Sequence, residues 1–93
     1  MSAPLARRRF RFYGTVQGVG FRWRARHAAE GLGLTGWVRN EYDGSVTLEL
    51  QGGDGQLDRA LEMLENGRFL SIDRMEVQTV PLDEDERGFH TLG

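Results

Sequence analysis

Residues 10–33 read FRFYGTVQGVGFRWRARHAAEGLG and place a strand pattern, a glycine-rich turn and a helix pattern in direct succession. Phe10, Phe12 and Val16 fall on alternate positions, which is the period of a strand that buries one face. Gly31 and Gly33 predict the end of the helix. The apolar residues before them recur with the spacing of one helix face: Phe21, Ala25, Ala28, Ala29 and Leu32.

The residues after the first helix predict a pair of strands. A second strand is expected at residues 35–40, followed by Asp43-Gly44, a strong signal for a two-residue hairpin. Alternating apolar residues predict a returning strand at 46–50.

A second helix and two further strands complete the pattern. Asp54 is the expected N-cap of the helix, and Gly67 is its expected end. The apolar face of this helix comprises Leu57, Ala60, Leu61 and Leu64. Alternation at 75–79 predicts a fourth strand, and residues 88–92 predict a short edge strand.

The order β-α-β-β-α-β with a short fifth strand predicts an α+β fold, in one domain over residues 1–93. Two right-handed crossovers give a ferredoxin-like split arrangement, a four- to five-stranded antiparallel sheet with both helices on one face. In this arrangement the first two strands run in the same direction with another strand between them. We therefore expect the loop at 15–22 and Asn40, at the end of the second strand, to meet at one edge.

Composition is that of an ordinary globular domain. The 93 residues are 39% hydrophobic and 28% charged, and a chain of this length supports one core. There is no cysteine, which excludes a disulfide scaffold, a thiolate zinc site and a cysteine nucleophile. No apolar signal segment precedes the arginines at 7–9, and no stretch approaches the roughly 18 apolar residues of a membrane span. We expect a cytoplasmic protein without a membrane partner.

Charge is distributed unevenly along the chain. Residues 1–40 carry eight arginines and one carboxylate, a balance of +7, whereas residues 41–93 carry four arginines and thirteen carboxylates, a balance of −9. This asymmetry is compatible with a solvated surface or with a site for a small anion in the first half, and composition leaves both interpretations open. The acidic run at 83–86 is expected to form a solvated loop.

The strand–glycine loop–helix unit is a recurrent way to bind phosphate, because backbone N–H groups and the positive end of the helix converge on the anion. Gly18 and Gly20 permit the positive φ that such a turn requires, and Arg22 adds a planar fork that suits phosphate oxygens. The nucleotide P-loop is excluded because no Gly-Lys-Ser/Thr follows, and the dinucleotide pattern fails at Trp23. Spacing alone leaves an ordinary glycine turn and an anion site equally open.

Asn40 closes the second predicted strand, where asparagine commonly serves turn geometry alone. Its place at the edge that receives the glycine loop suggests a second role. The side-chain carbonyl would accept a hydrogen bond from a water molecule, and the NH2 group would donate to a substrate. His27 and His90 show no metal-ligand spacing and are interpreted as surface residues, so we expect no metal site.

Two stretches resemble the signatures of the acylphosphatase family. The segment Gly14-Thr15-Val16-Gln17-Gly18-Val19-Gly20-Phe21-Arg22 is similar to the first, Gly-x-Val-Gln-Gly-Val-x-Phe-Arg. The segment Gly36-Trp37-Val38-Arg39-Asn40, followed by Asp43-Gly44 and Val46, is similar to the second. The similarity extends from residue 8 to residue 80.

This resemblance implies cofactor-free hydrolysis of acyl phosphates, mixed carboxylic–phosphoric anhydrides, to a carboxylate and phosphate. It assigns phosphate binding to Arg22 and water orientation to Asn40 as the catalytic residues. Trp23 is expected at the mouth of the site, where a large aromatic would alter the leaving-group preference. The expected partner is a small-molecule acyl phosphate, and we expect a monomer. The backbone amides expected to bind the substrate are those of Gln17, Gly18, Val19, Gly20 and Phe21, together with Arg22.

Two rival functions share the element order or the motif. RNA-recognition domains need an aromatic-rich third strand, whereas residues 45–50 contain no aromatic and include Glu49, so no nucleic-acid partner is expected. The second rival is an acylphosphatase-like domain that binds acyl or carbamoyl phosphate within a larger machine. The length of 93 residues favours a free-standing enzyme.

Overall fold

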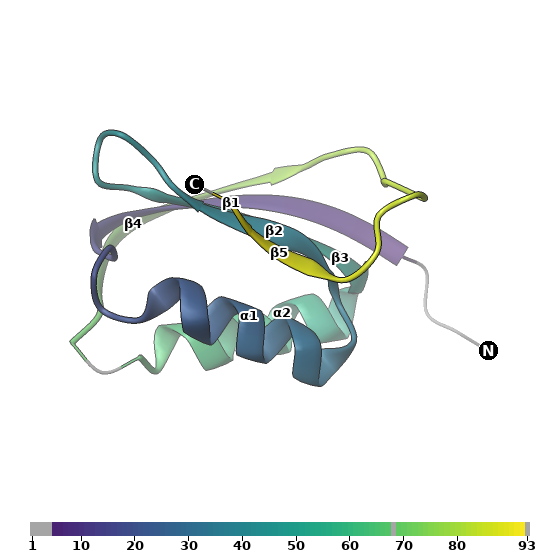
Figure 1. Ribbon diagram of the computed structural model, residues 1–93, viewed down its shortest axis with the longest axis horizontal. Helices are drawn as coiled ribbons and strands as arrows, with labels where there is room; N and C mark the ends of the chain where they lie inside the picture. Colours follow the sequence, from purple (N-terminus) through teal and green to yellow (C-terminus); the bar gives the residue numbers. More distant parts are fainter. Residues whose placement is uncertain (1–4, 68, 93) are drawn as a thin grey trace.

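The computed structural model describes residues 5–67 and 69–92, which form a five-stranded sheet with two helices packed against one face (Figure 1). The predicted domain limits at residues 1 and 93 lie outside the described residues. The elements in chain order are β1 (Leu5–Thr15), α1 (Phe21–Leu32), β2 (Thr35–Asn40), β3 (Val46–Gly53), α2 (Asp54–Glu65), β4 (Ser71–Thr79) and β5 (Phe89–Leu92). This arrangement confirms the predicted ferredoxin-like α+β fold.

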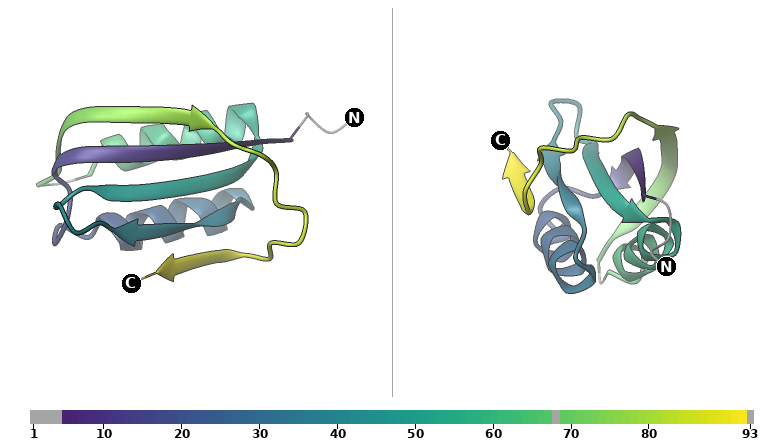
Figure 2. Two further views of the ribbon diagram at one scale, coloured as in Figure 1. Left: turned by 90° about the horizontal axis from the view of Figure 1, so that it is seen from above. Right: turned by 90° about the vertical axis from the view of Figure 1, so that its right-hand side faces the viewer.

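The sheet has the order β4-β1-β3-β2-β5, so β3 lies between β1 and β2 (Figure 2). Because β3 is antiparallel to both neighbours, β1 and β2 run in the same direction, as predicted. The short last strand differs from the expectation of a fully antiparallel sheet, since β5 pairs in parallel with β2. The chain leaves β4, passes along one end of the sheet and returns at the opposite edge. The last strand, β5, is therefore antiparallel to β4 and has the same direction as β2.

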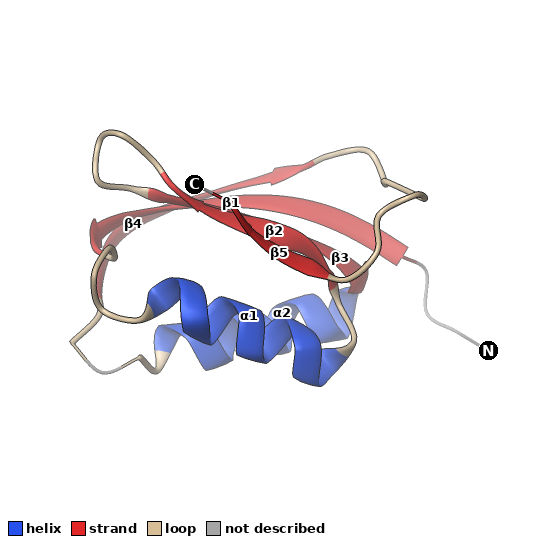
Figure 3. Cartoon of the chain, in the orientation of Figure 1, coloured by secondary structure: helices blue, strands red, loops and turns tan. Residues whose placement is uncertain are grey.

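The core fills the space between the sheet and the helix layer (Figure 3). Phe10 and Phe12 stack with ring centroids 6.0 Å apart, and Phe12 meets Phe21 of α1 at 5.0 Å. Each fully buried side chain of this size contributes about 1.5–3 kcal/mol of transfer free energy. The predicted helix faces are buried, except that Leu32 and Leu61 are only partly covered. In the described part of the chain, no helix is long and apolar enough to span a membrane.

The turn between β2 and β3 is longer than the two-residue hairpin that Asp43-Gly44 predicts. It comprises residues 41–45. The Asp43 carboxylate accepts hydrogen bonds from the Ser45 N–H at 3.0 Å and from the Ser45 hydroxyl at 2.6 Å. These local bonds compete with the strand ladder and hold a wider turn.

The start of α2 also differs by one residue from the prediction. Gly53, not Asp54, occupies the N-cap position, and the Gln56 side chain accepts a hydrogen bond from the Gly53 N–H at 3.3 Å. Asp54 lies in the first turn, where a carboxylate interacts favourably with the helix dipole. Its carboxylate also accepts a hydrogen bond from Arg8 of β1 at 2.8 Å.

Candidate active site

A cleft of about 150 Å³ opens where β1 passes into α1 and where β2 ends. We call it the loop cleft. It brings together five residues that the sequence assigned to catalysis or substrate binding: Gly18, Gly20, Phe21, Arg22 and Asn40. Trp23, which was expected at the mouth of the site, also lines it, as does Val16, which was not predicted as a site residue. Gln17 and Val19, which the sequence also assigned to substrate binding, are not among the residues that line the cleft.

The glycines of the loop adopt the conformation that the sequence predicts. Gly18 has φ 74° and Gly20 has φ 79°, a region that side chains with a Cβ rarely occupy. Gly20 is the N-cap of α1 and makes no side-chain cap, and no acidic residue lies in the first turn. The backbone N–H groups of this turn and the positive end of the helix are therefore available to an anion in the loop cleft.

Arg22 and Asn40 approach the loop cleft from different elements. Arg22 is half-buried in the first turn of α1, and Asn40 is the last residue of β2. The Oδ1 atom of Asn40 is buried and has no hydrogen-bond partner among the described residues. A buried acceptor without a partner costs about 1–3 kcal/mol, so this oxygen is suited to accept a hydrogen bond from a water molecule or a substrate.

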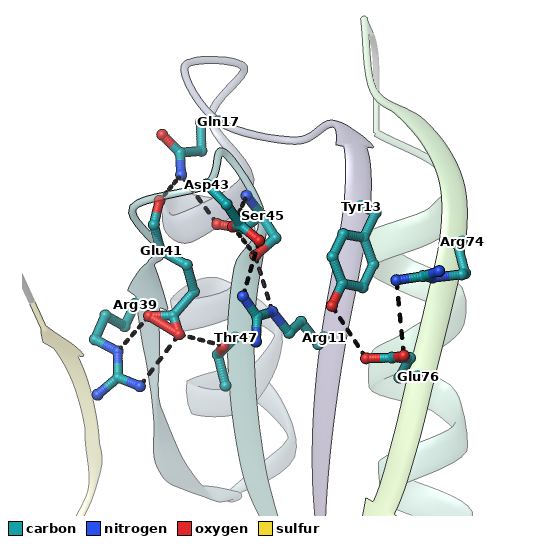
Figure 4. A network of polar contacts seen from close by, with 10 residues as sticks. All are labelled: Arg11, Tyr13, Gln17, Arg39, Glu41, Asp43, Ser45, Thr47, Arg74 and Glu76. Atoms are coloured by element: carbon teal, nitrogen blue, oxygen red, sulfur yellow. Dashed lines mark hydrogen bonds and ion pairs between the residues drawn. The ribbon is translucent and has the colours of Figure 1, made fainter.

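The Gln17 side chain connects the glycine loop to the turn that follows Asn40 (Figure 4). Its Nε2 donates to the carbonyl oxygen of Glu41 at 2.8 Å and to that of Ser45 at 2.9 Å. These bonds fix the loop relative to the end of β2, and hence relative to Asn40. The sequence analysis missed this role, because nothing in the motif indicates which distant carbonyl groups the amide meets.

The structure also shows the surroundings of the Trp23 side chain, which the spacing of residues in the sequence does not define. The indole is 65% exposed and lines the loop cleft. It stacks on His27 one helical turn later, with ring centroids 4.8 Å apart and an angle of 14° between the planes. His27 is exposed, as predicted.

A larger hollow, of about 610 Å³, lies on the face of the sheet that the helices leave open, and its cationic lining is already paired. Arg9 binds Glu49 at 2.8 Å, Arg11 binds Asp43 at 2.9 Å, and Arg39 binds Glu41 at 2.8 Å. Figure 4 shows the second and third of these pairs beside the β2–β3 turn. The hydrogen bond from Arg39 lowers the pKa of Glu41 below its usual value. We place the candidate active site in the loop cleft, because that is where the glycine loop, Arg22 and the buried Oδ1 of Asn40 meet.

The most buried ion pairs on the open face involve Arg7, which is 3% exposed. Its guanidinium donates to Glu49, and it forms two bonds to Glu86 at 2.7 and 3.1 Å. The hydrogen bond to Glu86 raises the pKa of Arg7 above its usual value. Burial acts to raise the pKa of Glu49, but hydrogen bonds from Arg7 and Arg9 outweigh it and lower that pKa. The prediction of a solvated acidic run at 83–86 is therefore wrong for Glu86.

Comparison with known proteins identifies close similarity over most of the chain. The family model described as Acylphosphatase matches residues 8–91. A curated protein from Mesorhizobium japonicum named Acylphosphatase is 51% identical over 71 residues, which cover 75% of this chain and 76% of that protein.

Solved structures show the same fold. The crystal structure of acylphosphatase from Bacillus subtilis superposes with a TM-score of 0.87 at 31% identity, covering 97% of this chain and all of that one. A second match is to full-length HypF in its phosphate- and nucleotide-bound form, with a TM-score of 0.90. That match is 23% identical and covers 100% of this chain but 12% of HypF, so it shows a shared fold alone.

Proposed function

Because this chain belongs to the acylphosphatase family, we propose that the loop cleft hydrolyses the carboxyl–phosphate bond of an acyl phosphate, with Arg22 binding the phosphate and Asn40 positioning the attacking water. The family relationship makes the chain an enzyme that acts on acyl phosphates. The assignment of each role to a residue is our proposal. The buried Oδ1 of Asn40, which lines the same cleft as Arg22, carries this proposal.

The phosphate would lie against the first turn of α1. Two of its oxygens can accept hydrogen bonds from the Arg22 guanidinium, while N–H groups of residues 17–22 bind the remaining negative charge. These donors are held by the fold before the substrate arrives, so little reorganisation is needed as charge moves during the reaction. The positive φ of Gly18 and Gly20, which is typical of turns whose amides converge on an anion, supports this placement.

Water would attack phosphorus while its proton passes to a phosphate oxygen of the substrate. The new O–P bond forms as the bond between phosphorus and the carboxyl oxygen breaks, and that bond's electron pair leaves with the carboxylate. Asn40 Oδ1 would accept a hydrogen bond from the water and hold it in line with the departing oxygen. An acyl phosphate has a good leaving group, so positioning and charge stabilisation suffice. We propose that this route needs no metal ion.

The test measures benzoyl phosphate hydrolysis in the presence of EDTA. We expect rapid turnover by the wild type and a loss of roughly a hundred- to thousandfold in kcat/KM for both Arg22→Ala and Asn40→Ala, which is typical for removal of a preorganised donor. Arg59→Ala and Asn66→Ala, at exposed positions in and after α2, are matched controls and should retain activity. Circular dichroism and thermal unfolding establish that each variant is folded.

Two outcomes would contradict the proposal. A folded wild type that does not hydrolyse the substrate would show that the loop cleft does not catalyse this reaction. If EDTA abolished the activity and a divalent cation restored it, the proposal that hydrolysis needs no metal ion would be wrong.

A further inference from the structure

Trp23 separates two adjoining hollows. It lines the loop cleft, and it also lines a hollow of about 100 Å³ between the two helices, together with Arg24, His27, Ala28 and Met63. We call this second space the helix hollow. Among the described residues, Trp23 is the one that lines both spaces, so it lies where they adjoin.

The position of the indole is well defined although most of its surface is exposed. The stacked imidazole of His27 covers one side of it, and α1 sets the spacing of the two rings. A large apolar side chain that remains 65% exposed gains little from burial in the protein itself. Such a side chain at the mouth of a polar cleft is suited to contact the apolar part of a ligand.

The helix hollow has apolar residues in its lining, beside Arg24 and His27, and it adjoins the cleft at Trp23. Ala28 is buried, and Met63 of α2 is 38% exposed and has an adaptable side chain. Arg24 donates a hydrogen bond from Nη2 to the carbonyl oxygen of Met63 at 3.1 Å, which joins the two helices at this point. The described residues that line the helix hollow include no acidic side chain.

We propose that Trp23 and the helix hollow bind the acyl group of the substrate and select aromatic or longer alkyl acyl phosphates over acetyl phosphate. This inference rests on the proposed function, because it requires the phosphate to lie in the loop cleft. Arg22 and Trp23 line the same cleft, so the acyl group of a phosphate held by Arg22 would lie within reach of Trp23. In-line displacement puts the leaving carboxyl oxygen on the side of phosphorus opposite the water. The water is held from β2 by Asn40, and Trp23 belongs to α1.

The first experiment compares kcat/KM for acetyl, butyryl and benzoyl phosphate, and measures inhibition by inorganic phosphate. In Trp23→Ala we expect kcat/KM for benzoyl phosphate to fall about tenfold, the effect of losing a few apolar contacts in a pocket. The value for acetyl phosphate and the inhibition constant for phosphate should change less than about twofold, because neither ligand reaches the indole. Trp23→Phe should retain most of the preference for benzoyl over acetyl phosphate. Met63→Ala, which shortens a side chain that α2 contributes to the helix hollow, should lower this preference.

Trp37→Ala is the matched control, because it removes an indole from the open face of the sheet. It should leave the ratio of the benzoyl to the acetyl value unchanged. An equal loss for all three substrates in Trp23→Ala, or no loss, would overturn the acyl subsite while leaving the proposed function intact. A wild type inert toward all three substrates would instead remove the proposed function, and the subsite with it.

A binding measurement keeps the proposal testable if Trp23→Ala does not fold. The chain has two tryptophans, so the fluorescence of Trp37→Phe comes from Trp23 alone. In benzoylphosphonate a C–P bond replaces the C–O–P linkage of the substrate, so this analogue is not hydrolysed. It should change the emission of Trp23 strongly, whereas inorganic phosphate should change it little. An equal response to both ligands would contradict contact between the acyl group and the indole.

Discussion

Arginines from the first half of the chain have opposite surroundings at the two ends of β1. At its start, Arg7 and Arg9 lie on the open face of the sheet and bind Glu49. Beyond its end, Arg22 lies in a cleft whose lining in the described part of the chain contains no acidic residue. The difference follows from register. Glu49 of β3 lies directly opposite Arg9 of β1. By contrast, α1 follows a glycine turn and has no acidic residue in its first turn. The same type of side chain therefore pairs with carboxylates of the sheet in one region and lines the proposed phosphate site in the other.

This comparison explains the uneven charge of the sequence. Each β1 arginine finds a carboxylate from the acidic second half: Arg7 with Glu49 and Glu86, Arg8 with Asp54 and Asp58, Arg9 with Glu49, and Arg11 with Asp43. The excess of +7 in the first 40 residues is thus largely matched within the fold. The basic character of the first half does not by itself define an anion site. Our proposal of a phosphate site rests instead on the conformation of the loop and on the residues that line the cleft, none of which is acidic in the described part of the chain.

The largest expected difference between the two regions comes from removing the buried cation. Arg7→Met leaves Glu86 and part of Glu49 without a partner, so the free energy of unfolding should fall by about 3–5 kcal/mol. The kcat/KM of the folded protein should stay the same, because Arg7 lies near the start of β1, whereas the loop cleft opens beyond the other end of that strand. Urea unfolding at neutral pH and acyl phosphate hydrolysis measure the two quantities.

Arg8→Ala is the matched control on the same strand. The partners of Arg8 are two exposed carboxylates, so its ion pairs should contribute less than about 1 kcal/mol. Equal losses of stability in the two variants would show that burial does not distinguish them. A large loss of activity in folded Arg7→Met would show that the open face and the cleft are coupled.

The sequence predicted the fold well, because periodicity identifies which residues are buried. The alternation of Phe10 and Phe12 identified the second half of β1, which begins earlier, at Leu5, and the helical spacing from Phe21 placed α1 correctly. It also predicted that Asn40 and the glycine loop would meet, since that follows from the direction of two strands. The sequence did not predict the Arg7–Glu86 ion pair. The two residues are 79 positions apart, and only the path of the chain after β4 brings them together.

The next largest effect should come from the connection between the cleft and the sheet. Gln17→Glu removes the two N–H donors that hold the carbonyl groups of Glu41 and Ser45 and brings a negative charge close to them. The position of Asn40 relative to the loop should become less defined. A misplacement of about 1 Å can cost roughly a hundredfold in rate, so we expect kcat to fall tenfold to a hundredfold. Steady-state kinetics with acyl phosphate measures this loss.

Inhibition by inorganic phosphate distinguishes positioning from simple loss of binding. The inhibition constant should change by less than about threefold in Gln17→Glu, because Arg22 and the loop amides remain. Gln78→Glu, an exposed position on β4, introduces the same charge without these bonds and should have little effect. Unchanged kcat in Gln17→Glu would show that the two hydrogen bonds do not set the geometry of the site.

The smallest expected effect concerns the dependence of stability on pH. Glu49 has a folded pKa below its ordinary value of about 4.3, since hydrogen bonds from Arg7 and Arg9 outweigh its burial. A carboxyl whose pKa is lowered by folding binds fewer protons when folded, so it stabilises the protein fully above the ordinary pKa. That contribution should decline as pH falls below about 4.3 and continues through the lower folded pKa.

Glu49→Gln removes this titration and should cost about 1–2 kcal/mol at neutral pH, where the charged hydrogen bonds are fully formed. The gap between wild type and variant should narrow on acidification, so the two stability curves converge below pH 4 or so. Urea unfolding at a series of pH values measures both curves, and Glu62→Gln, an exposed position on α2, should run parallel to the wild type. A constant gap across the series would mean that Glu49 has the same pKa folded and unfolded. The arginines of the open face would then act through packing, and charge pairing would no longer separate that face from the loop cleft.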